Sequence, residues 1–472
     1  MRPLCFLVSA MVLVGCGGGG ENADGGAVVV DAPGLLDAAT LDAPASDATS
    51  LDAGADAPPS LEADARSSFD LVLEEIASCD PARFDRVMHE VAWDAGWPLH
   101  GGERWLFVTR LADAPPSASL VGDLGAWDPA RWPATRCPDG ARFYVVINDV
   151  SVVGPALGSK YKWYVPRDDS YRAPEEATQY GYDEFGRFGW VSAPLDVAHL
   201  EQFPAFESRH LSDSRAFRAY LPAGFAPRSA AAATARTLLL HDGQNVFHPD
   251  AFFGGWRVDE ALATRGTDTV AIAVDNASDR MDAYTPVPDD LGGGSLGGRA
   301  GDYLALLEDE ALPFFRARYG IVAEGASLMV AGSSLGGLVT LVAAEREMAS
   351  MGCGAALSST VGWGSIDARA PLGRALVTTW AGHHAPLYLD TGGDVSGTCV
   401  DLDGDGVDDD ADDSDNHCVN LQMLERLSMQ GYVRDVDLTY AWVPGAPHNE
   451  AAWAARIGHA IDACAAMGWR RP

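Results

Sequence analysis

Lysine is almost absent from this chain, and so is any long apolar stretch after its first residues. Among 33 basic side chains, arginine supplies all except Lys160 and Lys162. These cations form no stripe of the kind that neutralises phosphates, which argues against nucleic-acid binding. No segment after residue 16 is apolar enough to cross a bilayer. The mature chain is therefore not expected to span a membrane.

Aromatic residues are missing from residues 17–66, which consist mostly of Gly, Asp, Ala, Pro and Ser. This segment has ten acidic side chains against one arginine, and residues 401–415 have nine aspartates and no base. The two stretches carry −18 of the formal charge of −34, so the rest of the chain is only moderately acidic. Such a composition buries too little apolar surface to offset chain entropy. Residues 17–66 are therefore predicted to be a disordered acidic linker.

The first sixteen residues have the pattern of an export signal. Arg2 precedes an apolar run that ends at Val14 and is too short to span a bilayer. The run leads into Leu13-Val14-Gly15-Cys16, which resembles a bacterial lipobox. The resemblance implies a lipoprotein signal peptide at residues 1–16 and acylation of Cys16. It also implies anchoring in the cell envelope by lipid, on the outer membrane or its periplasmic side. A plain secretory signal is the alternative.

Eight cysteines are present, and six remain once Cys5 and Cys16 are assigned to the export signal. An even number in an exported chain predicts disulfides, and six cysteines allow fifteen sets of pairs. The expected pairs close a short polar loop or stay within one domain. They are Cys399–Cys418, Cys79–Cys137 and Cys353–Cys464.

The apolar pattern divides the rest of the chain into residues 67–200 and residues 201–472. In the first part, helical spacing at 68–92 is followed by short strand-like runs between turn residues, which predicts helix followed by a small β-sandwich. In the second part, solid apolar runs alternate with helical stretches, which is typical of a doubly wound α/β domain. The strands expected are 105–108, 118–121, 143–147, 161–165, 237–240, 270–274, 328–331, 387–389 and 436–443. The helices expected in the second part are 256–263, 303–319, 335–348 and 451–466.

A candidate nucleophile follows the strand expected at 328–331. The sequence there is Gly332-Ser333-Ser334-Leu335-Gly336, and a helix follows. This is the G-x-S-x-G nucleophile elbow in the strand-to-helix context that it requires. The sharp turn leaves no room for side chains beside the nucleophile, which explains the two flanking glycines. The pattern predicts Ser334 as the nucleophile and leaves Ser333 out of register.

A serine hydroxyl needs a base and an orienting acid, which follow it in the order acid, then histidine, in the α/β-hydrolase fold. His448 lies in the loop between the last expected strand and the last expected helix, where the base belongs. The acid should lie just past the strand at 387–389, which favours Asp394 over Asp390. Asp415 is a third candidate, because the loop after that strand is long and acidic.

Two backbone N–H groups are expected to hold the oxyanion of the reaction. One comes from Leu335, the residue after the nucleophile. The other is expected from Gln244, in the turn His241–Asn245 that follows a predicted strand. Candidate substrate-binding residues in the neighbouring loops are Asn245, Trp256 and Arg280, each of which could equally serve packing or a turn.

An aspartate-rich insertion lies at residues 399–418. Counted from its first aspartate, it offers carboxylates at positions 1, 3, 5, 9 and 12 and glycine at position 6, a spacing suited to Ca²⁺. The expected ligands are Asp401, Asp403, Asp405, Asp409 and Asp412. The run resembles a thrombospondin-type calcium repeat, and a solvated acidic loop is the alternative. The metal is expected to be structural.

Four pieces of the second part, in order, resemble the enterochelin esterase and feruloyl esterase branch of the α/β-hydrolases. They are His241–Asn245, Gly254–Glu260, Gly332–Gly337 and His448–Trp453. The resemblance covers about residues 201–470 and implies a nucleophile at Ser334, a base at His448, a carboxylate near Asp394 and no catalytic cofactor. Residues 121–129 resemble immunoglobulin-like modules of starch- and glycogen-acting enzymes, which implies that the β-sandwich is immunoglobulin-like.

The function expected from these observations is hydrolysis of a carboxylic ester, small or glycan-linked, by a Ser–His–acid triad. The competing class is a non-catalytic, glycan-binding surface lipoprotein built on a hydrolase scaffold. An acyltransferase would use the same residues and differ only in the acceptor. The sequence leaves the identity of the ester open.

Overall fold

A computed structural model describes residues 61–148, 157–249, 251–266, 268–290, 294–365, 374–393, 399–401, 404, 406–408 and 415–472. The export signal, Cys16 and most of the expected linker lie outside these residues. So do Asp394 and four of the five expected metal ligands, which are Asp403, Asp405, Asp409 and Asp412. No helix among the described residues is both long and apolar enough to cross a bilayer.

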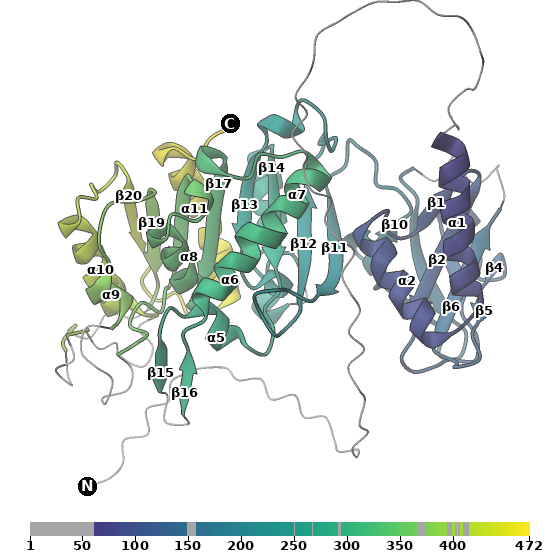
Figure 1. Cartoon of the computed structure of the whole chain (residues 1–472), viewed down its shortest axis with the longest axis horizontal. Helices are drawn as coiled ribbons and strands as arrows, with labels where there is room; N and C mark the ends of the chain where they lie inside the picture. The colour runs from purple at the N-terminus through teal and green to yellow at the C-terminus, as the bar shows by residue number, and fades with distance from the viewer. Residues whose placement is uncertain are drawn as a thin grey trace, which may run out of the picture. The chain divides into compact units, whose positions relative to one another are not determined.

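Two helices begin the described part of the chain, α1 (Leu61–Ala77) and α2 (Pro81–Trp93) (Figure 1). The first starts at Leu61, inside the segment expected as linker. Residues 61–66 contain Leu, Glu, Ala and Arg, which favour helix, and the acidic composition concealed that preference. The second helix is capped by Asp80, whose side chain accepts the N–H of Arg83.

Two antiparallel sheets follow the helices. The first has the order β1 (Leu99–Gly101), β2 (Arg104–Arg110), β6 (Arg142–Ile147) and β5 (Thr135–Arg136). The second has the order β4 (Trp132–Pro133), β3 (Ser119–Gly122), β7 (Lys160–Val165), β10 (Gly186–Trp190) and β9 (Gln179–Asp183), with β8 (Ser170–Arg172) paired to β7. Phe107, Val145 and Trp163 belong to a core that strands of both sheets share. The four strands predicted in this part are confirmed as β2, β3, β6 and β7.

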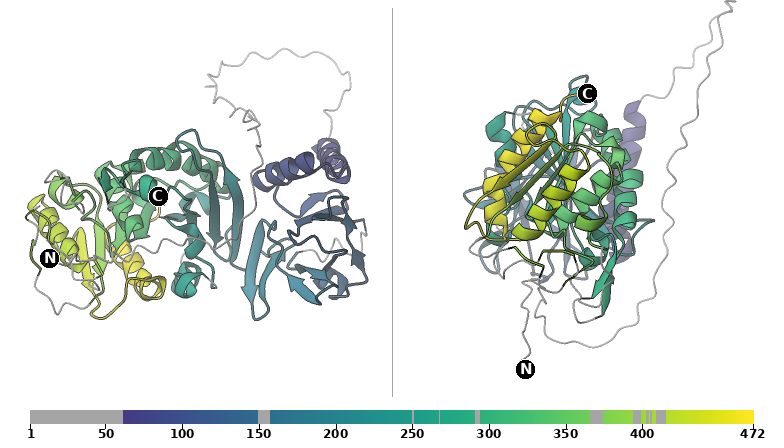
Figure 2. Two further views of the ribbon diagram at one scale, coloured as in Figure 1. Left: turned by 90° about the horizontal axis from the view of Figure 1, so that it is seen from below. Right: turned by 90° about the vertical axis from the view of Figure 1, so that its left-hand side faces the viewer.

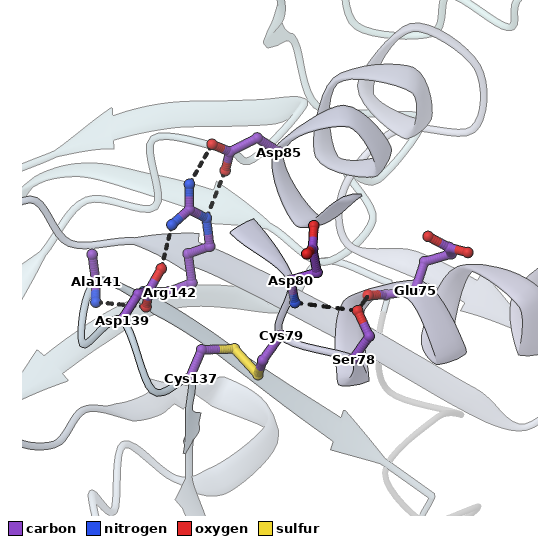
Figure 3. Close-up of a disulfide and its surroundings, with 9 residues drawn as sticks. All are labelled: Glu75, Ser78, Cys79, Asp80, Asp85, Cys137, Asp139, Ala141 and Arg142. Atoms are coloured by element: carbon purple, nitrogen blue, oxygen red, sulfur yellow. Dashed lines mark hydrogen bonds and ion pairs between the residues drawn. A yellow bond between two sulfur atoms is a disulfide. The ribbon is translucent and has the colours of Figure 1, made fainter. Parts of the chain in front are cut away.

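The helices are attached to the first sheet by a disulfide and an ion pair. Cys79, in the turn between α1 and α2, is bonded to Cys137 (Figure 3). Arg142 on β6 pairs with Asp85 of α2 and with Asp139. Phe69, Phe84 and Leu106 lie in the apolar cluster between these helices and the sheet.

The second sheet continues without interruption into a larger one. β11 (His199–Phe206) pairs with β9 on one side and with β12 (Arg215–Leu221) on the other. The expected domain boundary at residue 200 therefore falls within this strand. Beyond β12 the order is β14 (Thr269–Val274), β13 (Arg236–Leu240), β17 (Leu328–Ser333), β18 (Cys353–Leu357), β19 (Leu387–Thr391) and β20 (Leu438–Trp442). All pairs from β14 to β20 are parallel.

Helices cover both faces of this sheet (Figure 2), as the alternating strands and helices predict. One layer contains α4 (Val258–Arg265) and α11 (Glu450–Met467). The other contains α6 (Ala300–Leu306), the π-helical turn η6 (Leu307–Ala311), α7 (Leu312–Tyr319), α8 (Leu335–Glu345) and α10 (His417–Met429). The short helices are α5 (Arg280–Tyr284) and α9 (Leu376–Thr379), and β15 (Pro288–Asp290) and β16 (Ser295–Gly297) form a separate hairpin.

The central strand β18 was not predicted from the sequence. Its sequence is Cys-Gly-Ala-Ala-Leu, which lacks the β-branched and aromatic residues that mark strands. Small side chains are needed here because the strand is buried on both faces: a Cβ on Gly354 would lie 3.0 Å from the Cε of Met351. Packing therefore selects residues whose intrinsic preference is not for strand.

All three expected disulfides are formed, which confirms the predicted pairing. Cys353 on β18 is bonded to Cys464 on α11 over a sequence separation of 111, whereas Cys399 and Cys418 are 19 apart. The first of these bonds fixes α11 to the centre of the sheet.

Replacing both Cys353 and Cys464 with alanine should lower the free energy of unfolding more than replacing Cys399 and Cys418. Chain entropy gives about 4.7 kcal/mol for a loop of about 100 residues and about 3 kcal/mol for one of about 15. Urea denaturation of the two double variants measures the difference. An equal or reversed order would show that loop closure does not govern these bonds.

Candidate active site

The turn between β17 and α8 holds Ser334 in a strained conformation. Ser334 has φ 55° and ψ −123°, a backbone conformation that residues other than glycine rarely adopt. A Cβ on Gly332 would overlap the backbone of Gly336, and a Cβ on Gly337 would lie 3.0 Å from that of Ser359. The glycines therefore permit the turn, as the elbow pattern predicts.

The nucleophile candidate is fixed to the end of β18. The N–H of Ser334 donates to the carbonyl of Leu357 at 3.0 Å, and its own carbonyl accepts the N–H of Thr360 at 3.2 Å. Its hydroxyl lies 3.4 Å from the hydroxyl of Thr360. Asn416 donates to the carbonyl of Ser358 at 2.9 Å, so the segment before α10 meets the residues beside Ser334.

His448 and Asp415 form a hydrogen-bonded pair. The Nδ1 of His448 lies 2.5 Å from the Oδ1 of Asp415. The imidazole is 34 % exposed, whereas the carboxylate is buried. The chain order Ser334, Asp415, His448 is the order of the α/β-hydrolase triad.

Asp415 is the third of the three candidates for the acid, and the favoured candidate, Asp394, lies outside the described residues. The Oδ2 of Asp415 accepts the N–H of Gly392 at 2.5 Å and the hydroxyl of Ser358 at 2.7 Å. Burial on its own would raise the pKa of Asp415. The hydrogen bonds from His448 and Ser358 and the charges of His448 and Arg456 outweigh burial, so its pKa is lowered. The carboxylate facing the imidazole is therefore ionised near neutral pH.

Asp390, the second candidate, does not contact His448 in the described structure. Its side chain is buried beside Arg456, and it accepts the hydroxyl of Tyr388 at 3.0 Å. Burial raises the pKa of Asp390 to about 7, against the opposing charge of Arg456. It therefore belongs to the layer behind Asp415.

The hydroxyl of Ser334 and the imidazole of His448 share no hydrogen bond in the described residues. The backbone of Ser334 meets Leu357, while the adjoining Ser358 meets Asp415, so the two halves of the site meet at the end of β18. Catalytic hydrogen bonds are often long in structures without substrate and shorten when substrate binds.

The turn after β13 faces the start of α8. A Cβ on Gly336 would lie 3.2 Å from the Oδ2 of Asp242, which places this turn beside the elbow. Among the described residues, no acceptor meets the backbone N–H of Leu335 or that of Gln244. The side chain of Gln244 is fixed from behind, because its Oε1 accepts the N–H of Asn276 at 3.0 Å.

An ion pair braces this turn. Arg280 donates to both oxygens of Asp242, at 2.7 and 2.8 Å, and Asn276 donates to the same carboxylate. His241 is buried, and its Nδ1 lies 2.8 Å from the hydroxyl of Tyr303. Burial lowers the pKa of this histidine to about 4. Asp242 and Arg280 thus organise the turn. A role in a turn was one of the two roles expected of Arg280, the other being substrate binding.

Two further expected substrate-binding residues have defined contacts. Asn245 donates to Glu450 at 3.2 Å, which links the turn after β13 to the first residue of α11. Trp256 is buried against Trp453 with ring centroids 5.9 Å apart, so its contacts are those of a core residue.

The expected metal site is described only in part. Asp401 accepts the N–H groups of Gly404 and Gly406 through its two oxygens, at 2.6 and 3.0 Å. No group of three or more potential metal ligands occurs among the described residues, and four of the expected ligands lie outside them.

Chemically, this arrangement suits attack by a hydroxyl on an acyl carbon. A strained serine lies at a helix N-terminus, a histidine is oriented by an ionised buried carboxylate, and two N–H groups lie on neighbouring turns.

Residues 208–457 match the model of a protein family described as putative esterase. No curated protein sequence matches the chain. Similar solved structures include an enterobactin esterase from Shigella flexneri, with 13 % identity, TM-score 0.41 and coverage of 76 % of this chain and 92 % of that one. A siderophore hydrolase from Aspergillus nidulans has 17 % identity, TM-score 0.40 and coverage of 56 % and 94 %. A ferulic acid esterase has 15 % identity, TM-score 0.40 and coverage of 57 % and 99 %.

The identity of the acid can be tested by covalent labelling with a fluorophosphonate probe. Asp415→Asn should slow labelling of Ser334 by roughly 10⁴-fold, because the imidazole loses its orienting anion. The matched variant Asp394→Asn should label at close to the rate of the parent protein, because the Nδ1 of His448 is already paired with Asp415. Loss of labelling in Asp394→Asn instead would assign the acid to that residue.

Proposed function

This chain belongs to the esterase family and is a carboxylic ester hydrolase, and we propose that Ser334, His448 and Asp415 are its catalytic triad. The single observation that carries the proposal is the His448–Asp415 hydrogen bond beside the strained serine of the elbow. We propose Asp415 in place of Asp394 because Asp415 occupies the Nδ1 side of the base.

In the proposed mechanism the Oγ of Ser334 attacks the carbonyl carbon of the ester while the Nε2 of His448 accepts the hydroxyl proton. The N–H groups of Leu335 and Gln244 hold the resulting oxyanion. When the C–O bond breaks, His448 returns the proton to the leaving alcohol. Water then attacks the acyl-enzyme, His448 accepts a proton from it, and Ser334 is regenerated. No cofactor takes part in these steps.

The electrostatics of the site support this sequence of steps. The ionised carboxylate of Asp415 stabilises the imidazolium that forms when the serine proton moves to His448. The half-exposed position of the imidazole leaves its Nε2 side open to substrate, because Asp415 is the partner of Nδ1.

We propose a small-molecule or glycan-linked ester as the substrate. Polar side chains lie at the oxyanion turn: Asn245 donates to Glu450, and Asn276 and Arg280 donate to Asp242.

Replacing Ser334 by alanine should lower kcat for p-nitrophenyl ester hydrolysis by roughly 10⁴-fold or more, because no other group supplies the nucleophile. Ser333→Ala is the matched control, since this buried neighbour lies on β17 outside the elbow position. Its kcat should change little. Retention of turnover in Ser334→Ala would reject the assignment, and a panel of aryl, acetyl and short-chain esters on the parent enzyme would define the acyl group.

We also propose that the insertion at 399–418 binds a structural Ca²⁺ through Asp401, Asp403, Asp405, Asp409 and Asp412. The carboxylate of Asp401 accepts the N–H groups of Gly404 and Gly406, so the chain turns back towards Asp401 at these glycines. Such a turn is needed for several ligands to converge on one ion. The disulfide Cys399–Cys418 closes the insertion three residues after Asp415.

Calcium should therefore raise the melting temperature of chelator-treated protein. Linkage gives about 2.7 kcal/mol of stabilisation at a free Ca²⁺ concentration of about 100 times Kd. Differential scanning calorimetry with Ca²⁺, and with Mg²⁺ as the control, measures the effect, which Asp405→Asn should abolish. An unchanged melting temperature in millimolar Ca²⁺ would reject the metal site and favour the alternative, a solvated acidic loop.

Two further assignments complete the proposal. Acylation at Cys16 and the acidic linker would place the enzyme at the cell envelope, held by lipid on the outer membrane or its periplasmic side. The two antiparallel sheets that precede β11 would be an immunoglobulin-like module, an assignment supported by their shared core.

A further inference from the structure

A buried arginine lies behind the acid of the proposed triad. Arg456, on α11, is 2 % exposed, and its Nη atoms lie 3.5 Å from the Oδ2 of Asp415. Its Nη1 also lies 3.6 Å from the Oδ1 of Asp390 on β19. One cation thus lies between two buried carboxyl groups, of which Asp415 is the one with a lowered pKa. A buried charge needs such a partner.

Ser358 joins this arginine to the acid. Its hydroxyl accepts hydrogen bonds from Arg456 at 2.8 Å and from the indole N–H of Trp453 at 3.0 Å. A serine hydroxyl has one proton to donate, and the two donors occupy its acceptor sites. The proton is therefore directed at the Oδ2 of Asp415, 2.7 Å away.

The backbone around the acid needs such support. Asp415 and Asn416 both have positive φ values, 56° and 60°, and they lie in a loop before α10 and not at a strand end. Ser358 also has a positive φ, 46°. Strained segments of this kind persist only where tertiary contacts fix them.

One helix ties the base to the acid. His448 lies directly before Asn449, the N-cap of α11. Trp453 and Arg456 lie in the first two turns of the same helix. The helix that positions the imidazole therefore also carries the donors that hold the carboxylate. The disulfide between Cys353 and Cys464 fixes that helix to β18, the strand that ends at Leu357, one residue before Ser358.

We propose that Arg456 and Ser358, backed by Asp390, are positioning residues that hold the carboxylate of Asp415 against His448. This inference rests on the proposed triad. None of the three needs to touch the substrate, so their effect is on kcat and on the acid–base behaviour of the site, while KM is unaffected.

The test compares Arg456→Met with Arg456→Lys and with Arg265→Met. Arg265 also pairs with α11, through Asp462 at 2.8 and 2.9 Å, and so controls for loss of an ion pair on that helix. Arg456→Met should lower kcat by roughly 10²-fold, the cost of misplacing a catalytic group by about 1 Å. KM should be unchanged, Arg456→Lys should recover part of kcat, and Arg265→Met should retain it.

The pH profile gives a readout that loss of stability alone would not move. Asp390, Tyr388 and Asp415 lie around Arg456, and His448 lies beyond Asp415. Glu450 also acts on His448, and His417 also interacts with Asp415; both are unchanged in the variant. Removing the cation leaves more negative charge beside His448, which favours the imidazolium. The acid limb of kcat/KM in Arg456→Met should therefore move to higher pH.

Ser358→Ala provides a second variant should Arg456→Met fail to fold, because it removes only one hydroxyl. It should lower kcat with KM retained. Unchanged kcat in Ser358→Ala, or in a folded Arg456→Met, would overturn the inference. Ser334→Ala assayed in parallel separates the two levels: if it is inactive, the triad stands and only the positioning role fails, whereas retained turnover in Ser334→Ala would reject the triad itself.

Discussion

The hydrogen bond between Asp415 and His448 is the interaction on which the rest of this site depends. A serine hydroxyl is a weak nucleophile at neutral pH, and only a correctly oriented neutral imidazole can accept its proton. The orientation comes from a carboxylate that is buried yet ionised, held by four groups that donate or carry charge. The position of the proposed acid therefore depends on contacts from several elements of the fold.

That structure is distributed over the centre of the sheet. The proposed nucleophile, Ser334, follows β17 directly. Ser358, which donates to the proposed acid, follows β18, and Gly392, whose N–H does the same, follows β19. Parallel strands place their carboxyl ends at one edge, so three consecutive loops converge there. The last helix closes the arrangement from the opposite layer and is fixed to β18 by a disulfide. The geometry of the site therefore depends on the sheet being intact.

The sequence predicted much of this arrangement because local rules dominate where it succeeded. The elbow at Ser334 needs small residues on both sides, which a sequence displays directly. Short apolar runs rich in β-branched residues, such as 270–274, favour buried strands. The disulfides followed from loop length and domain membership. These signals need no knowledge of distant contacts.

It fell short where tertiary packing overrides local preference. The small residues of β18 do not resemble a strand, and helix formers inside an acidic composition concealed the start of α1. Spacing favoured Asp394, which lies outside the described residues, whereas the carboxylate that meets His448 is Asp415, near the end of the insertion at 399–418. Arg456 and Ser358 lie far apart in sequence, 98 residues, so only the fold could bring them together.

Mass spectrometry of a rapidly quenched reaction with a slowly deacylating ester tests the central claim most directly. The account predicts that the acyl mass appears on the peptide that contains Ser334, accumulates within one turnover and disappears as hydrolysis is completed. Turnover without any acylated intermediate, or an acyl group bound to another residue, would contradict it.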